Sequence, residues 1–528
     1  MSAISTDTIA AIATAPGAGG IAILRISGTE TLRILCRLFT PASGDRRAGP
    51  ERSGPVQSGA VEQCPTTPGE CAASLFRSRP RYMQYGHALD GSGQVIDDVL
   101  AVYMPGPHSA TGEDVGEIHC HGGTGMAALL LESCLRAGAR AASGGEFTRR
   151  AFLHGKMDLT QAEAVAELIN APGREGIRLA QAKLEGHLSR HIRSLRHALD
   201  QLRVQVTLAV DFPEEEAELL SRQAFDATLE QAREEIRGLL AGYARARLWR
   251  EGVSVVLAGR VNAGKSSLLN ALLGRRRAIV SDTPGTTRDY IEEMVSLAGM
   301  PVRLFDTAGL RDSGDVVEEE GIRFSRGLAG EADCLLLVTD GTLGITAEDW
   351  EFLRTHEQAV RRGRVLLLVN KVDKQLSAGK GEEYTAPAST PASESGMPLF
   401  GLAAPSPAHA ELLSLCRPFA VSAKFGSGLE ALVEGIRAAV TGSSSSAAAM
   451  DVREAGTGDV APNIRQALLL ESALAELDAL ADDLAQEMPA DILGVRLDVV
   501  VSFLDEVTGA SSTEELLDQI FSSFCIGK

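Results

Sequence analysis

A glycine-rich segment near the middle of the chain carries the residue types that bind nucleotide phosphates. It runs from Gly259 to Ser267 as GRVNAGKSS, after the apolar run VSVVLA and before the helix-forming run SLLNALLG. In the pattern GxxxxGK[ST], backbone N–H groups converge on the phosphates and Lys265 reaches the terminal ones. The Ser266 hydroxyl is then placed to hold Mg²⁺. A chance match in a glycine-rich loop would lack this strand-then-helix context, so the segment predicts a phosphate-binding loop.

A second segment could complete the phosphate and magnesium chemistry. Asp306-Thr307-Ala308-Gly309 ends an apolar strand. There the Asp306 carboxylate can order the water shell of Mg²⁺, and the Gly309 amide can sense the γ-phosphate.

Two later segments could select the base. Asn370-Lys371-Val372-Asp373 ends another apolar strand, and Ser422-Ala423-Lys424 follows the last one. The Asp373 carboxylate is suited to accept hydrogens from N1 and N2 of guanine, a pair that adenine lacks. An unpaired buried acceptor costs ~1 to 3 kcal/mol, which favours GTP over ATP. Ser422 to Lys424 is expected to pack on the base from the other side.

The hydrolytic machinery must differ from that of Ras-like proteins. Leu310 follows Asp-Thr-Ala-Gly where those proteins place a glutamine that orients water. Two candidates could replace it: Asn262 in the phosphate loop, and the acidic run Glu318-Glu319-Glu320. Acidic residues at a helix start also simply complement the helix dipole, and the charge pattern alone leaves both readings open.

The elements around these motifs predict several domains. A chain of 528 residues exceeds one domain at about 100 to 200 residues each. Apolar strands alternate with amphipathic helices between 253 and 440, which predicts a mainly parallel sheet wrapped by helices. Helical periodicity dominates 159–250 and resumes after about Pro462. The simplest inference is a sheet domain inserted into a helical one.

Two stretches look like insertions into these domains. Residues 42–80 and 377–409 are rich in Pro, Gly and Ser with few large apolar residues. This composition predicts solvated segments rather than core elements.

Charge, cysteines and hydropathy narrow the function classes. The formal net charge of −19 argues against a surface that binds nucleic acid through overall positive charge, so any RNA contact must be local. Eight scattered cysteines without a CxxC pair predict reduced thiols. The start lacks a secretory pattern and the apolar runs are strand-sized, so we expect a cytoplasmic protein without membrane association.

Seven ordered blocks carry a family resemblance over nearly everything outside the two insertions. They are ATAPGAGGIAILRISG, TGEDVGEIHCHGG, GEFTRRAFLHGKMDLTQAEA, GRVNAGKSSLLNALLG, SDTPGTTRDY, DTAGLRDSGDVVEEEGI and FSSFCIGK. The chain resembles the tRNA-modification GTPases of the MnmE (TrmE) family. The resemblance implies an N-terminal α/β domain that dimerises and binds a tetrahydrofolate, and an all-α, discontinuous helical domain with an inserted Ras-like P-loop GTPase domain. The expected boundaries are 1–154 for the N-terminal domain, 155–250 and 463–528 for the helical parts, 251–442 for the GTPase domain and 443–462 for a linker.

The resemblance also implies K⁺-activated hydrolysis, with the cation joining two GTPase domains of a dimer and replacing an arginine finger. A monovalent cation there offsets charge that develops between the phosphates. The family's K⁺ ligands fall on the Asn262 side chain, the Ser281 and Thr283 carbonyls, and Thr286. Ser281 stands where other members carry threonine, but a main-chain ligand tolerates the change.

The remaining catalytic roles follow from the same resemblance. Thr287 would complete the Mg²⁺ shell with Ser266, and Glu318 matches a catalytic glutamate acting through a bridging water. Catalysis is thus expected from Glu318, Asn262 and Lys265. The full set of expected GTP-binding residues is Asn262, Ala263, Gly264, Lys265, Ser266, Ser267, Ser281, Asp282, Thr283, Pro284, Gly285, Thr286, Thr287, Asp306, Thr307, Ala308, Gly309, Asn370, Lys371, Asp373, Ser422, Ala423 and Lys424.

The implied folate site is a 5-formyl- or methylene-tetrahydrofolate pocket at Arg25, Glu117, Lys156 and Lys528. A carboxylate can pair with pterin N–H donors, and cations can meet the glutamate tail. Without the resemblance, Arg25 and Lys156 would be interpreted as surface charges. Cys525 is either a modification thiol or a small structural residue, and His121 either lines the pocket or serves structure.

The implied function is installation of an aminomethyl or carboxymethylaminomethyl group on carbon five of the wobble uridine of certain tRNAs. The partners would be a second copy in a homodimer, the FAD-dependent MnmG (GidA) protein in a heterotetramer, tRNA and GTP. One alternative is a ribosome-assembly GTPase of the Era or Der kind, although this chain lacks their RNA-binding appendage or second GTPase domain. Another is a folate-binding module that only senses GTP.

Overall fold

The computed structural model describes residues 7–42, 68–211, 222–274, 292–306, 332–374, 406–441 and 460–527. Contacts divide the chain into two units, considered separately below. Unit 1 comprises Met1–Ala166, Lys183–Glu234 and Leu468–Lys528, and unit 2 comprises Glu167–Ala182 and Glu235–Ala467. Within the described ranges, no helix combines the length and apolar composition needed to cross a bilayer.

Unit 1 begins with a seven-stranded sheet in the order β3-β4-β5-β6-β2-β1-β7. Alternate residues of its strands face a core, as Leu24 and Ile26 do, while Arg25 between them faces the other side. The strands are β1 (Ile9–Ile12), β2 (Ile21–Ser27), β3 (Phe39–Pro41), β4 (Gln84–Leu89), β5 (Val95–Met104), β6 (Val115–His121) and β7 (Arg140–Ala141). Helices α1 (Thr31–Leu38), α2 (Pro68–Ser78) and α3 (Thr124–Arg136) supply the apolar side chains that cover the core face. The helix α4 (Glu146–Leu153) follows.

Helix α2 corrects the first predicted insertion. Its Ala72 and Phe76 are fully buried, and the Phe76 ring lies 5.3 Å from that of Phe39 between centroids. The prediction that the whole stretch 42–80 is solvated and contributes no core element is therefore wrong for its last part. Ala72 and Phe76, one turn apart, form an apolar stripe too short to stand out against the surrounding composition.

The second predicted insertion, 377–409, also ends slightly earlier than expected. Helix α15 (Pro407–Leu415) begins inside it, and the His409 ring packs edge-on against Trp350 at 4.7 Å between centroids. Residues 375–405 lie outside the described ranges.

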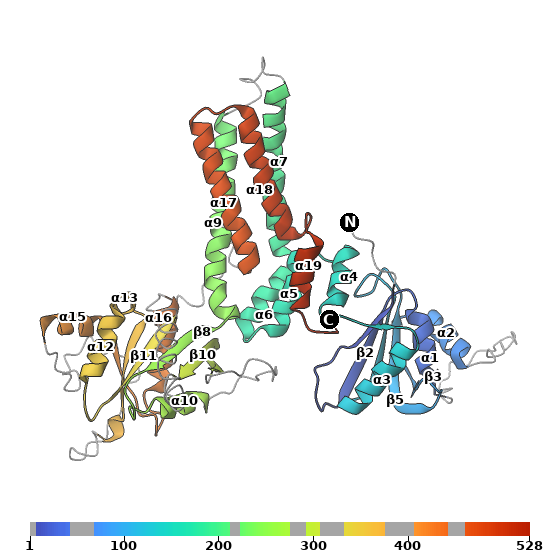
Figure 1. The fold of residues 1–528 in the computed structure, drawn as a ribbon, viewed down its shortest axis with the longest axis horizontal. Coiled ribbons are helices and arrows are strands. Elements are labelled where there is room, and N and C mark those ends of the chain that lie inside the picture. Colours follow the sequence, from blue (N-terminus) through green and yellow to red (C-terminus); the bar gives the residue numbers. More distant parts are fainter. Residues whose placement is uncertain are drawn as a thin grey trace, which may run out of the picture. The chain divides into compact units, whose positions relative to one another are not determined.

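The helical part of unit 1 joins segments from both ends of the sequence. Helix α7 (His187–Asp211) lies along α18 (Ala490–Thr508), and Arg196 of α7 donates to Asp505 of α18 (Figure 1). Helices α5 (Leu159–Asn170), α9 (Arg222–Arg250), α17 (Ile464–Ala485) and α19 (Glu514–Ser522) complete it, although α5, α9 and α17 also extend into unit 2. Because α7 and α18 come from the two separate helical segments, their pairing confirms the predicted discontinuous helical domain. The exact domain boundaries stay predictions.

Unit 2 holds a six-stranded sheet in the order β13-β12-β11-β8-β10-β9. Every neighbouring pair is parallel except β9 and β10, as the alternation of strands and helices predicts. The strands are β8 (Val253–Ala258), β9 (Glu292–Leu297), β10 (Met300–Asp306), β11 (Cys334–Asp340), β12 (Val365–Asn370) and β13 (Arg417–Ala420).

Helices cover both faces of this sheet, so β11 and β12 are buried along their whole length. Apolar residues of α10 (Lys265–Leu273) and α16 (Leu429–Thr441) pack on one face. Those of α12 (Ala347–Thr355), α13 (Glu357–Arg361) and α15 pack on the other. Helix α6 (Arg174–Leu184) packs through Leu179 against Ala246 and Ala461. The parallel strands bring the ends of β8, β11 and β12 to one edge, where a ligand site is expected.

Candidate nucleotide site and N-terminal charged cluster

The loop between β8 and α10 needs glycine at two positions. Gly259 and Gly264 have φ angles of 132° and 98°. A Cβ at Gly259 would lie 2.2 Å from the Val338 carbonyl oxygen, and one at Gly264 would lie 2.3 Å from the Asn370 amide nitrogen. The loop therefore runs tightly against β11 and β12, and its backbone approaches the start of α10, where N–H groups favour an anion.

Lys265, the first residue of α10, turns back over this loop. Its Nζ donates to the carbonyl oxygens of Gly259 at 2.8 Å and Arg260 at 3.0 Å, and the side chain is buried. The ammonium is thus held beside the loop whose N–H groups would surround a phosphate. Ser266 follows it as the second residue of the helix. Both residues therefore lie at the start of α10, next to the loop, and their phosphate and Mg²⁺ roles stay predictions.

Asn370, at the end of β12, links the phosphate loop to the base-binding segment. Its buried side-chain amide donates to the Ala263 carbonyl at 2.9 Å, and its Oδ1 accepts from the Ala423 N–H at 3.2 Å. This residue, predicted to bind GTP, acts here by holding two loops together.

Lys371 makes a second connection at the same edge. Its Nζ donates to the Asn262 carbonyl at 2.6 Å and to Asp340 Oδ2 at 2.8 Å. Lys371 and Asn262 both have positive φ, 64° and 65°, an uncommon conformation for residues with a Cβ. The lysine thus spans from the end of β12 to the residue predicted to bind K⁺.

Asp340 anchors this lysine, and the sequence reasoning missed it. The carboxylate is 9% exposed and also accepts from the Thr342 N–H and hydroxyl at 3.0 and 2.7 Å. Burial alone would raise the pKa of Asp340, but the hydrogen bonds from Lys371 and Thr342 outweigh burial and lower the pKa to about 2. An aspartate at the end of a central parallel strand, here in VTDGT, was the available signal.

The expected base-binding residues lie together. The Ser422 hydroxyl donates to Asp373 Oδ1 at 2.8 Å, which fixes the carboxylate predicted to read guanine. The Lys424 ammonium lies over the exposed Phe425 ring, 5.1 Å from its centroid. The two segments that were expected on either side of the base are therefore joined by a direct hydrogen bond.

A charged cluster in unit 1 contains two of the predicted folate residues. It consists of Arg25, Glu117, His119 and the carbonyl of Gly527. Arg25 donates to Glu117 Oε1 at 2.9 Å and to the Gly527 oxygen at 3.3 Å, while His119 Nε2 lies 3.2 Å from Glu117 Oε2. Side-chain exposure of 25% for Arg25 and 15% for Glu117 leaves both reachable.

The C-terminal tail reaches this cluster because two glycines accommodate it. Ile526 forms a β-bridge with Gly144, and Gly145 N–H donates to the Cys525 oxygen at 3.3 Å. Cys525 itself is exposed. The residue before Lys528 thus contacts Arg25, although Lys528 lies outside the described residues.

The two other candidates in this domain have separate partners. Lys156 donates to the Pro107 oxygen at 3.1 Å. His121 is exposed, and its Nδ1 lies 2.7 Å from Asp97 Oδ1; the hydrogen bond to this carboxylate raises the pKa of His121. Within the described residues, the hydrogen bonds of Lys156 and His121 therefore join neither residue to the charged cluster.

Comparison with known proteins identifies the family. A model described as the GTP-binding protein TrmE N-terminus matches residues 8–156, and one described as the MnmE helical domain matches residues 159–525. The tRNA modification GTPase MnmE of Nitratidesulfovibrio vulgaris (strain DP4) is 50% identical over 99% of this chain and 99% of its own length. The chain belongs to the MnmE (TrmE) family of tRNA modification GTPases.

Other MnmE proteins match at similar coverage. That of Lawsonia intracellularis is 39% identical over 99% of this chain and 100% of its own length. That of Pseudomonas paraeruginosa is 38% identical, covering 99% of each chain. The predicted family resemblance and fold class are confirmed, and the chain is a GTP-hydrolysing enzyme of tRNA modification.

Several predicted MnmE site residues lie outside the described ranges. They are Ser281, Asp282, Thr283, Pro284, Gly285, Thr286, Thr287, Thr307, Ala308, Gly309, Glu318 and Lys528. Asp306 ends β10 next to β8, but its side chain is not described. Of the predicted K⁺ ligands, the described residues therefore include Asn262 alone. Of the predicted Mg²⁺ ligands, they include Ser266 alone.

Proposed function

We propose that this MnmE-family enzyme hydrolyses GTP in a K⁺-dependent reaction and takes part in modifying carbon five of the wobble uridine of certain tRNAs. With the FAD-dependent MnmG (GidA) protein, it would install an aminomethyl or carboxymethylaminomethyl group. The observation that carries the proposal is that one chain holds both the Ser422–Asp373 hydrogen bond, within the segments predicted to read guanine, and the charged cluster at Arg25 and Glu117.

The base-binding contacts support GTP as the nucleotide. The Ser422 hydroxyl donates to one carboxylate oxygen of Asp373 and so fixes the side chain. A fixed carboxylate distinguishes guanine from adenine more sharply than a mobile one, because less side-chain entropy is lost when the base binds. Ser266 and Thr287 would hold Mg²⁺, which supplies charge neutralisation at the phosphates. Lys265 adds a positive charge at the same phosphates.

The exposed Asn262 supports the K⁺ proposal. Its carbonyl is fixed by Lys371, so the residue keeps one backbone conformation and its amide side chain starts from a defined position. An amide oxygen is a hard ligand of the kind that alkali cations accept. Ser281, Thr283 and Thr286 would supply the other oxygens, and closure of the site would require a second copy in a homodimer.

The charged cluster supports a pterin-type ligand. Glu117 offers carboxylate oxygens to N–H donors, and Arg25 offers N–H groups to acceptors, so the donor set fits a tetrahydrofolate. Lys156 and Lys528 would meet the anionic tail of the ligand. The bound 5-formyl- or methylene-tetrahydrofolate would supply the one-carbon unit. Cys525, an exposed thiol two residues before Gly527, would be available to this chemistry.

GTP hydrolysis would serve movement between subunits rather than bond formation on the uridine, because a phosphate loop offers no group that reacts with a uracil ring. Most of the tRNA would be held by the MnmG partner in a heterotetramer. Since its substrate is tRNA, we place the enzyme in the cytoplasm.

The test is nucleoside analysis of tRNA from cells lacking the gene, complemented with wild-type protein or with an Asp373→Ala variant. The wobble modification should disappear without the gene and return with the wild type, but not with the variant. Unchanged wobble nucleosides would contradict the proposal. A ribosome-assembly GTPase, the alternative, would instead change the profile of ribosomal subunits.

A further inference from the structure

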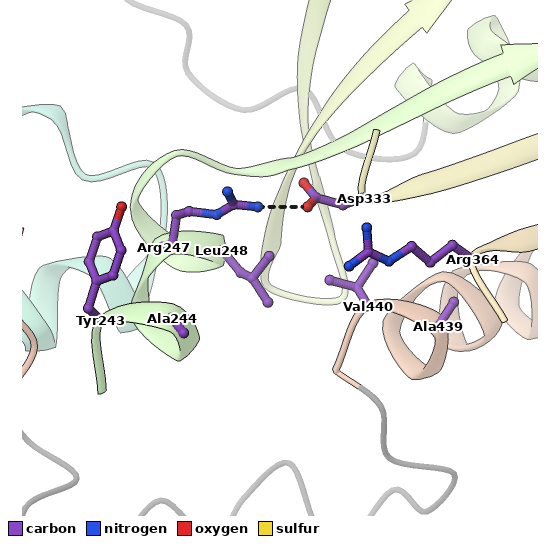
Figure 2. A pocket seen from close by; sticks show the side chains of 8 residues that line it. All are labelled: Tyr243, Ala244, Arg247, Leu248, Asp333, Arg364, Ala439 and Val440. Carbon is purple, nitrogen blue, oxygen red and sulfur yellow. Dashed lines mark hydrogen bonds and ion pairs between the residues drawn. The ribbon is translucent and has the colours of Figure 1, made fainter. Parts of the chain in front are cut away.

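Unit 2 contains a hollow of about 300 Å³ (Figure 2), and the residues before β11 and β12 place it at the sheet edge opposite the nucleotide site. Asp333 precedes β11 and Arg364 precedes β12, so both line the amino-terminal edge of the parallel strands. The phosphate loop leaves β8 at the carboxyl edge. The hollow is lined by Tyr243, Ala244, Arg247, Leu248, Asp333, Arg364, Ala439 and Val440.

Arg247, one of the two arginines that line the hollow, is held in place by Asp333, which Ser254 holds in turn. Arg247, near the end of α9, donates through Nη2 to Asp333 Oδ1 at 2.9 Å. The other oxygen of Asp333 accepts from Ser254 N–H at 2.9 Å and from its hydroxyl at 2.8 Å. Arg247 is therefore held at one wall, with its charge matched by Asp333.

The second arginine has no such partner. Arg364 extends from the start of β12 across the hollow toward the side where Arg247 lies (Figure 2). Its guanidinium makes no hydrogen bond or ion pair within the described parts of the chain. Asp333 is the single acidic side chain in the lining and is matched by Arg247, so Arg364 contributes the unmatched positive charge.

The other lining residues suit a ligand with both polar and apolar parts. Tyr243 offers a phenol at one side, and Leu248, Ala439 and Val440 provide an apolar wall. A guanidinium fork matches the geometry of phosphate oxygens, while a phenol and apolar surface suit the adjoining sugar. Because the chain carries a formal net charge of −19, any RNA contact must be local, and this hollow with its unmatched guanidinium offers such a contact.

We propose that this hollow binds a phosphodiester group of the tRNA backbone, with Arg364 as the main contact and Arg247 and Tyr243 beside it. The inference rests on the role in tRNA modification proposed above. A backbone contact positions the RNA and carries no sequence preference of its own.

The test measures binding of fluorescently labelled tRNA to the full-length protein as salt is increased. Arg364→Gln should weaken binding several-fold and make the log–log salt slope shallower by about 0.7 to 0.9, the change expected for one lost phosphate contact. Arg362→Gln is the matched control, because Arg362 is exposed in the same turn and does not line the hollow. GTP turnover without tRNA should be unchanged in both variants.

Three outcomes would overturn the inference. The first is tRNA binding by Arg364→Gln equal to that of the wild type. The second is equal loss in both variants, which would indicate diffuse surface charge. The third is a site for inorganic phosphate that depends on Arg364 while tRNA binding does not. If the wild-type protein alone bound no tRNA, this inference would also fail. The role in tRNA modification would not fail with it, because that role is tested separately by the wobble nucleosides of cells lacking the gene.

Discussion

Lys371 donates a 2.6 Å hydrogen bond to the carbonyl oxygen of Asn262, so a residue of the base-recognition motif sets the shape of the phosphate loop. Both residues keep left-handed φ angles, which persist only where surrounding contacts enforce them. The contact connects recognition of the base to the position of the proposed K⁺ ligand. It depends in turn on Asp340, which binds the same ammonium.

Asp340→Asn should weaken GTP binding by about tenfold, since hydrogen bonds to charged groups contribute ~1.5 kcal/mol or more. The pKa of Asp340 falls from 3.8 unfolded to about 2 folded. Its ionised form therefore stabilises the fold above about pH 4, and this contribution of about 2 kcal/mol is lost as pH falls through about 2. Acid unfolding between pH 4 and 2 should be less steep in the variant. The exposed Glu348→Gln is the control, and identical acid curves for Asp340→Asn and wild type would contradict the role.

Turnover of GTP should be faster in K⁺ than in Na⁺ at equal ionic strength, because the proposed cation offsets charge between the phosphates. Asn262→Ala should remove most of the difference by deleting a ligand. Asn270→Ala, on the exposed side of α10, should retain it. Equal rates in the two salts for the wild type would rule out the K⁺ role of Asn262.

Glu318→Ala should leave GTP affinity nearly unchanged and slow hydrolysis by about a hundredfold or more, the range for loss of a group acting through proton transfer or water positioning. Glu320→Ala is the control, because it removes another carboxylate of the same acidic run; it should hydrolyse GTP at the wild-type rate. Single-turnover hydrolysis and nucleotide binding would be measured on the same preparations. Normal turnover of Glu318→Ala would return this residue to the role of complementing a helix dipole.

Glu117→Gln should reduce binding of 5-formyl-tetrahydrofolate by about ten- to a hundredfold, because the charge-assisted hydrogen bonds of the carboxylate are lost. Calorimetric titration would measure the affinity, and GTP turnover should stay at the wild-type rate. Glu132→Gln removes an exposed carboxylate of the same domain and should bind folate normally. Equal affinities for all three proteins would place the folate elsewhere.

Phe76→Ala should lower the free energy of unfolding of its domain by about 3 to 5 kcal/mol, since a fully buried phenyl ring is replaced by a cavity. Ser74→Ala, exposed on the same helix, should change it by less than about 0.5 kcal/mol. Denaturant unfolding followed by circular dichroism would compare them. A Phe76 variant as stable as the control would mean that α2 does not belong to the core.

Sequence reasoning was most successful where chemistry is contained in a few consecutive residues. The phosphate loop and the Asn370-Lys371-Val372-Asp373 motif are such cases, and alternating apolar runs were enough to predict the parallel sheet. The roles of Asp340 and Asp333 were not predicted, because they depend on partners distant in sequence, Lys371 and Ser254. A spacing rule cannot detect such pairs, since only the fold brings them together.

The charged cluster illustrates the same limit. Arg25 and Gly527 are 502 positions apart, so nothing local indicates their contact. The resemblance placed the neighbouring Lys528 in the same pocket as Arg25, and the bridge between Ile526 and Gly144 holds this tail near Arg25. Helix α2 was missed for a different reason, because two buried side chains in a polar stretch give too weak a periodic signal.

The pairing of α7 with α18 also constrains the order in which a nascent chain can fold. Arg196 and Asp505 are separated by 309 positions, so α7 cannot pair with α18 until the residues between them have been synthesised. The strands and helices of the GTPase sheet, by contrast, are contiguous in sequence and can assemble while α7 is still unpaired. During that interval the buried face of α7, including Leu195, Leu199 and Leu202, is exposed and open to chaperones. The segment that pairs with α7 is thus translated after all the strands of the GTPase sheet.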